Sequence, residues 1–222
     1  FALAVGDLNG DGALDIVQGN FRQSYIYWND GHGGFGSSTP LGGANNSKGI
    51  ALGDVNGDGV LDIIQGNYGG PSLVYLNDGR GGFGAGAPFG SPHLTIDIAV
   101  GDVNGDGTLD IVQGNERQPS IVYLNDGQGR FSAETSLGGP NDTESIALGD
   151  MNGDGTLDIL QANWGQPGVL YLNDGRGGFG ASVALDGTYL TTNMAVGDVN
   201  GDGTLDIIRL NTDSPNVVYI NT

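Results

Sequence analysis

The residues of this chain best suited to chemistry are aspartates, and they stand in a repeated loop. The string Asp-x-Asn-x-Asp-Gly-x-Leu-Asp begins at Asp7 and returns four times, at steps of 47 or 48 residues. Oxygen-bearing side chains occupy loop positions 1, 3, 5 and 9, and position 7 can offer its carbonyl. Hard divalent cations take six to eight oxygen ligands, and a tight loop can turn alternate side chains toward one centre. The loops therefore predict cation sites.

Calcium suits this ligand set better than other common metals. Each loop offers three carboxylates and one amide, while the absence of Cys and His from the loops disfavours zinc. Magnesium keeps more of its waters and takes fewer protein oxygens. Without a cation the three carboxylates would repel one another. A solvated acidic turn would explain a single copy, but five copies with Gly at the same position favour metal, so we predict one Ca²⁺ per repeat, five in all.

The predicted calcium ligands are Asp7, Asn9, Asp11, Ala13 and Asp15 in the first loop; Asp54, Asn56, Asp58, Val60 and Asp62 in the second; Asp102, Asn104, Asp106, Thr108 and Asp110 in the third; Asp150, Asn152, Asp154, Thr156 and Asp158 in the fourth; and Asp198, Asn200, Asp202, Thr204 and Asp206 in the fifth.

Each loop sits inside a longer unit that is predicted to form four short strands. In the second copy these are residues 50–53, 61–65 and 73–76, and a fourth strand around Phe83. Asp-Gly between β-branched and aromatic runs favours a hairpin, because Gly accepts the positive φ of a tight turn. Helical EF-hands are disfavoured, since each loop leads at once into a β-branched run and has no Glu at position 12. Four-stranded units at this period predict an all-β fold, a β-propeller of antiparallel blades.

The repeats fill the whole chain, which we interpret as one propeller domain over residues 1–222. Its five repeats of about 48 residues cover 1–49, 50–97, 98–145, 146–193 and 194–222. The last repeat stops after its third strand and lacks an outer strand. The alternative is that these repeats are part of a seven-bladed propeller or of an assembly in which another chain supplies the missing strand.

Composition excludes several classes of function. A formal charge of −19 makes nucleic acid an unfavourable partner, and no apolar run approaches the ~20 residues of a membrane span. The lack of Cys removes disulfide scaffolds and thiol nucleophiles. No His stands near a repeated Ser or Asp, and no Gly-rich phosphate loop leads into a helix, so we expect a protein that is not an enzyme.

The segment Phe83-Gly84-Ala85-Gly86-Ala87-Pro88, together with the five acidic loops, resembles the FG-GAP and VCBS repeats of integrin-α-type β-propellers. Similar repeats occur in fungal integrin-like propeller lectins. The resemblance covers the full chain. It implies calcium between the first and second strands of each blade on one face, and ligands on the opposite face, at the loops joining strands two to three and four to one. Most such propellers have seven blades, so five units are a departure.

The repeats differ most in the loop after the second strand, where aromatic side chains stand among Asn and Gln. Aromatic faces stack on sugar C–H groups while amides bond hydroxyls, so we predict a sugar site there. The alternative is that the aromatics cap the gap between blades and the amides satisfy loop backbone. The candidate ligand-binding residues are Asn20, Phe21, Asn67, Tyr68, Asn115, Asn163 and Trp164.

These features together predict a secreted, calcium-stabilised binding module with glycans as the first ligand class. The extracellular location follows because calcium sites of low affinity (Kd ~10⁻⁴–10⁻³ M) fill only where the ion is abundant. The chain starts at Phe1 without a signal peptide, which indicates a processed product. The alternative function is a protein-interaction, adhesion or structural scaffold that self-assembles through the open edge of its last blade.

Overall fold

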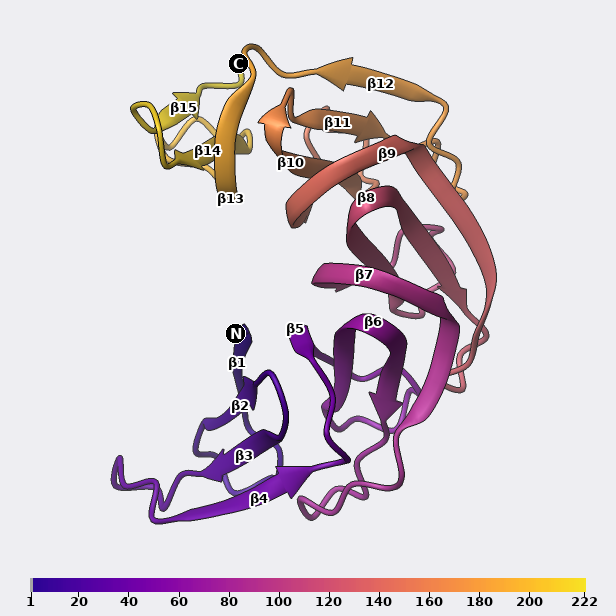
Figure 1. The fold of residues 1–222 in the computed structure, drawn as a ribbon, viewed down its shortest axis with the longest axis vertical. Helices are drawn as coiled ribbons and strands as arrows, with labels where there is room; N and C mark the ends of the chain where they lie inside the picture. The colour runs from indigo at the N-terminus through magenta and orange to yellow at the C-terminus, as the bar shows by residue number, and fades with distance from the viewer. Residues whose placement is uncertain (1) are drawn as a thin grey trace.

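The computed structural model describes residues 2–222, which form strands and turns with no helix among them. The all-β prediction is therefore confirmed. The strands of successive repeats stand like spokes along an arc, with β1, β5, β7, β9 and β13 on its inner side (Figure 1). The first and last repeats do not meet, so the arc is not closed into a ring (Figure 1). Within residues 2–222 no helix has the length and apolarity that crossing a membrane requires.

The first repeat is a separate four-stranded antiparallel sheet. Its strands are paired in chain order, β1 to β2 to β3 to β4. In β2 the buried and half-buried residues alternate, as expected for a strand with one face against the core. The strand bounds are β1 (Ala2–Gly6), β2 (Asp15–Gly19), β3 (Ser24–Trp28) and β4 (Ser37–Leu41).

In the next repeats, strands that the sequence separates are continuous. The predicted second and third strands of repeat 2 are one strand, β6, with irregular register around Tyr68 and Gly70. The predicted break at Gly66 and Asn67 is wrong, because Tyr68 pairs with Leu94 in the segment that leads into the next repeat. Neighbouring repeats are thereby joined in one sheet path. The strands are β5 (Ser47–Gly53), β6 (Asp62–Tyr75), β7 (Ala87–Gly101), β8 (Asp110–Asn125) and β9 (Phe131–Gly149).

The last two repeats return to shorter strands. Repeat 4 is made of the end of β9 with three further strands, and repeat 5 has three strands within the described residues. The remaining strands are β10 (Asp158–Gln166), β11 (Val169–Leu172), β12 (Ala181–Ala184), β13 (Tyr189–Gly197), β14 (Asp206–Asn211) and β15 (Val217–Tyr219).

The outer strand of repeat 2 begins later than predicted. Phe83 forms only an isolated bridge with Asn77, and the strand starts at Ala87. The reason is the turn between them, in which the Asp78 carboxylate accepts hydrogen bonds from the N–H groups of Arg80 and Gly82. This side chain closes a wide turn that holds Phe83 outside the ladder.

The hydrophobic core lies between adjacent repeats. Val55 and Ile64 of repeat 2 belong to one buried cluster with Ile111 and Ile121 of repeat 3. The inner strands approach closely: a Cβ placed on Gly53 would lie 2.8 Å from Leu109 Cδ1 of the next repeat. Glycine is required at such approaches because interiors are close-packed.

Candidate functional site

Each acidic loop is folded around its first aspartate. In the second loop the Asp54 carboxylate accepts hydrogen bonds from the N–H groups of Gly57, Asp58 and Gly59 at 2.7–3.1 Å. Gly57 and Gly59 have φ values of 75° and 89°, which favour glycine. The same bonds recur in the other four loops. In the first loop, backbone N–H donors, chiefly that of Gly12, hold the pKa of Asp7 below its ordinary value.

The aspartate at loop position 9 is buried and ties the loop to the sheet. Asp62 accepts the Val55 N–H through Oδ2 and the Asn77 N–H through Oδ1. Burial raises the pKa of Asp62, and the nearby charges of Asp58 and Asp54 raise it further. Equivalent pairs of bonds are made by Asp15, Asp110, Asp158 and Asp206.

The predicted calcium ligands therefore share a loop, but their oxygens are turned onto neighbouring donors. Asn56 Nδ2 donates to Asp58 Oδ2, and the Asn56 Oδ1 accepts the Asp58 N–H. Among residues 2–222 no three acidic or histidine side chains form a group placed to hold a cation. The donor types still suit Ca²⁺, since carboxylate oxygens accept more than one bond and positions 1, 3 and 5 are solvent-facing. Calcium binding remains a prediction.

The same face holds an interaction that the sequence did not reveal. Asn77 Nδ2 donates to the Leu8 carbonyl in the acidic loop of the preceding repeat, and to the Leu61 carbonyl of its own. We name this side chain and its counterparts the inter-repeat asparagines. In the sequence, Asn77, Asn125 and Asn173 are marked only by their place at the start of an Asn-Asp-Gly string, and a hairpin turn explains that string equally well. The equivalent bonds to a preceding loop are made by Asn125, Asn173 and Asn221.

On the opposite face, the asparagines predicted to bind ligand are turned inward. Asn67 is buried, its Nδ2 donates to the Pro71 carbonyl, and its Oδ1 accepts from Gln65. The amides thus satisfy loop backbone, the alternative weighed from the sequence, because buried carbonyls need donors. We leave them out of the candidate ligand site. The same contacts are made by Asn115 and Asn163, and Asn20 donates to the Gln23 carbonyl.

The predicted aromatic residues are more accessible. Phe21 and Trp164 have 66% and 38% of their surface exposed. Tyr68 is half-buried, and its hydrogen bond to the Glu116 carboxylate raises the pKa of the tyrosine hydroxyl. Of these three, Trp164 also lines a cavity with charged neighbours.

This cavity, here named the Trp164 cavity, has a volume of about 240 Å³ and lies where repeats 3 and 4 meet. The guanidinium of Arg117 stands between two carboxylates, with Nη2 3.3 Å from Glu116 Oε1 and Nε 3.7 Å from Asp142 Oδ1. Glu116 pairs with Asp142 across β8 and β9, so strand register brings these side chains together. The cavity is lined by Glu116, Arg117, Asp142, Glu144 and Trp164.

Arg117 has an unusual backbone. Its φ is 55°, and no other non-glycine residue in the described chain has a positive φ. The matching positions in repeats 2 and 4 are Gly69 and Gly165, with φ values of 82° and 67°. An L-residue in this conformation costs roughly 1–2 kcal/mol, so an arginine kept there indicates a role for its side chain. The sequence signal was an arginine where two other repeats have glycine.

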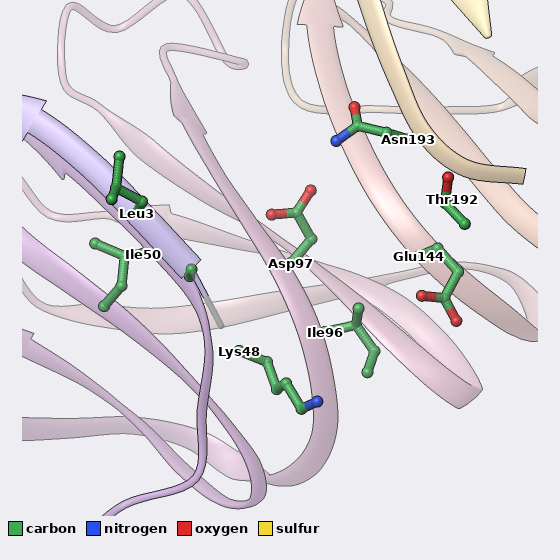
Figure 2. Close-up of a pocket in the computed structure, with 9 residues that line it drawn as sticks. Leu3, Lys48, Ile50, Ile96, Asp97, Glu144, Thr192 and Asn193 are labelled. Atoms are coloured by element: carbon green, nitrogen blue, oxygen red, sulfur yellow. The ribbon is translucent and has the colours of Figure 1, made fainter. Parts of the chain in front are cut away.

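A second cavity of about 440 Å³, here named the axial cavity, lies among the inner strands. Figure 2 shows Asp97 on β7, between Lys48 and Glu144 of neighbouring strands, with Asn193 nearby. Asp97 accepts the N–H groups of Ile98 at 2.9 Å and of Ile146, in the neighbouring inner strand β9, at 2.8 Å. Burial raises the pKa of Asp97 and of Glu144. In sequence these acidic residues are scattered and form no recognisable group.

The arrangement of repeats defines a propeller-like repeat protein that carries the Trp164 cavity and the axial cavity. The chain belongs to the FG-GAP-like repeat family, whose model matches residues 7–65, 55–113, 102–161 and 156–209. A search of curated proteins found no match.

Similar solved structures include two lectins. A lectin of Agrocybe aegerita, described as recognising non-reducing terminal N-acetylglucosamine, is 27% identical, with a TM-score of 0.59 over 81% of this chain and 50% of that one. The BP39L lectin of Burkholderia pseudomallei is 13% identical, with a TM-score of 0.73 over 99% of this chain and 69% of that one, and shows the fold alone.

The V. cholerae biofilm matrix protein Bap1 is 23% identical, with a TM-score of 0.57 over 93% of this chain and 34% of that one, and likewise shows the fold alone. The chain thus spans about half the length of the fungal lectin and about a third of the biofilm protein.

Proposed function

We propose that this chain is a calcium-stabilised, secreted carbohydrate-binding module that supplies five blades of a β-propeller. The observation that carries the proposal is Trp164, partly exposed beside Arg117 and three carboxylates in one cavity. An indole offers an apolar face for sugar C–H groups, and charged donors and acceptors bond hydroxyls strongly. The likeness to the Agrocybe aegerita lectin supports the same ligand class.

Calcium would act on the opposite face, by holding the acidic loops in shape. The inter-repeat asparagines bond to carbonyls of those loops, so an ordered loop also supports the contact between repeats. At ~100-fold excess over Kd, one bound ion adds about 2.7 kcal/mol to the free energy of unfolding. The residues that would hold the ion are those at loop positions 1, 3, 5, 7 and 9.

A second candidate function, a scaffold that binds protein, is favoured by the last repeat. Val218 and Ile220 are each 50% exposed there, because repeat 5 has no outer strand in the described chain. A cavity of about 160 Å³ lies beside Tyr219 and Met151. An open strand edge with exposed apolar residues can accept a strand from another chain.

A glycan array in calcium buffer tests the first proposal. We expect saturable binding that Trp164→Ala abolishes and Phe21→Ala leaves intact, because Phe21 is exposed but lines no charged cavity. Loss of binding in both variants would place the sugar elsewhere. Silence of the wild type on the array, with concentration-dependent assembly in solution, would favour the scaffold.

A further inference from the structure

The Trp164 cavity and the axial cavity share a residue. Glu144 lines both of them, and it belongs to β9, which passes from one to the other. The two cavities also lie at the same end of the inner strands. Lys48 is near the start of β5, whereas Ile96 and Glu144 lie well inside β7 and β9. The residue before each of them pairs with the asparagine that ends a second strand: Ser47 with Asn67, Thr95 with Asn115 and Thr143 with Asn163.

The size of the Trp164 cavity is small for a complete site. Sites for small ligands usually occupy about 300–1,000 Å³. The Trp164 cavity has about 240 Å³, below this range, whereas the axial cavity that adjoins it at Glu144 has about 440 Å³. A ligand that occupies both cavities would have room for a disaccharide or a longer oligosaccharide.

The polar groups of the axial cavity are placed to meet hydroxyls. Within residues 2–222, neither Lys48, Asp97 nor Glu144 forms an ion pair within 4.0 Å. Lys48 and Glu144 line the same cavity; burial raises the pKa of Glu144, and the Lys48 ammonium opposes that rise. Asp97 is held by two backbone N–H groups and keeps further capacity to accept. Donors and acceptors are therefore both present.

Comparison among the repeats shows that these positions are specialised. The position of Lys48 is Ile96, Glu144 and Thr192 in the following repeats, so its character changes each time. The residue just before it is always Ser or Thr, and the alanine three residues after it never changes. Ile50, which also lines the axial cavity, does repeat, as Ile98 and Ile146, so the variation is confined to the side chains around it. Variation confined to these positions favours a binding surface over a structural channel.

We propose that the two cavities form one elongated site for an uncharged oligosaccharide, with one sugar on Trp164 and the next units crossing Glu144 toward Lys48. The chain carries a net charge of −19, which disfavours polyanionic glycans. This inference rests on the proposed carbohydrate binding and adds ligand length and direction to it.

Titration calorimetry of the full chain with N-acetylglucosamine and its β-1,4-linked dimer, trimer and tetramer tests the proposal. We expect affinity to rise roughly tenfold or more from monomer to trimer. Lys48→Ala should remove most of this gain while leaving monomer binding, because Lys48 lines the axial cavity and not the Trp164 cavity. Glu144→Gln, at the residue that lines both, should weaken monomer and trimer binding together, and Trp164→Ala should abolish both. Arg80→Ala, which removes an exposed cation from a turn on the acidic-loop face, is the matched control for charge and should change nothing.

The outcomes separate the two proposals. Equal affinity for monomer and trimer, or a gain that Lys48→Ala does not reduce, would overturn the elongated site and leave carbohydrate binding standing. If no sugar of the series binds, from monomer to tetramer, and the melting temperature is unchanged in every variant, the carbohydrate proposal is overturned for this sugar series, and the elongated site with it.

Discussion

Asn77 of the second repeat donates a hydrogen bond, 2.8 Å long, to the carbonyl of Leu8 in the acidic loop of the first repeat. The same amide also donates to the Leu61 carbonyl of its own repeat, so one side chain joins the acidic loops of two successive repeats. The cation-binding face and the contact between repeats are thus one structure. A substitution or an ion that alters the acidic loops should therefore also alter the contact between repeats, and the reverse should hold as well.

Loss of an inter-repeat asparagine should destabilise the fold. Asn125→Ala removes donors from the buried carbonyls of Val55 and Leu109, and we expect a loss of about 1–3 kcal/mol in the free energy of unfolding. Asn29→Ala is the control, since in the described chain the Asn29 amide donates to the Leu14 carbonyl of its own repeat and accepts from the Gly31 N–H, with no bond to another repeat. Urea denaturation measures both; equal losses would show that the bond between repeats contributes nothing.

Removal of calcium should lower the melting temperature sharply. The carboxylates at positions 1, 5 and 9 of a loop would then repel one another, and the asparagines would bond to a looser loop. Differential scanning calorimetry with and without EDTA is the measurement, and calcium should restore the transition where equimolar magnesium does not. A melting temperature that EDTA leaves unchanged contradicts the structural role of the ion.

Close packing between inner strands predicts a contrast between two glycines. A Cβ on Gly49 in β5 would lie 2.8 Å from the Ile98 backbone nitrogen of the neighbouring inner strand β7, and 3.0 Å from the Asp97 carbonyl carbon. Gly49→Ala should therefore cost about 1–3 kcal/mol. Gly197 occupies an inner strand with no atom within 4 Å of such a Cβ, so Gly197→Ala should be nearly neutral. Similar unfolding midpoints for the two variants would argue against this packing in solution.

Arg117 should contribute more to binding than to stability. Arg117→Gly relieves the left-handed backbone but increases the freedom of the unfolded chain, so the free energy of unfolding should stay within about 1 kcal/mol of wild type. Glycan affinity should fall, because the guanidinium between Glu116 and Asp142 is lost. Arg22→Gly, at the matching loop position of repeat 1 without a positive φ, should leave binding unchanged. Undiminished affinity in Arg117→Gly would remove Arg117 from the site.

The acidic turns were the part of the structure that the sequence predicted. Gly57 and Gly59 sit where the acidic loop needs positive φ, and Asp54 accepts the N–H groups that this turn exposes. These contacts span five residues or fewer, so residue type and spacing were sufficient to predict them. The prediction of separate strands failed because the pairing partner was distant: β6 is continuous since Tyr68 meets Leu94 of β7. Asn67 is different, because its partner, the Pro71 carbonyl, is only four residues away, but residue type alone does not say whether an amide turns toward its own loop or toward solvent.

By itself, then, the sequence determined that this protein is an array of β-rich repeats with five identical acidic turns, because such turns depend on neighbours only a few residues away. Tertiary structure alone decided that Glu116, Glu144 and Trp164 line one cavity, and that Lys48 stands in the cavity beside it. Those side chains meet through strand register and the stacking of one repeat on the next, and neither is encoded in local spacing.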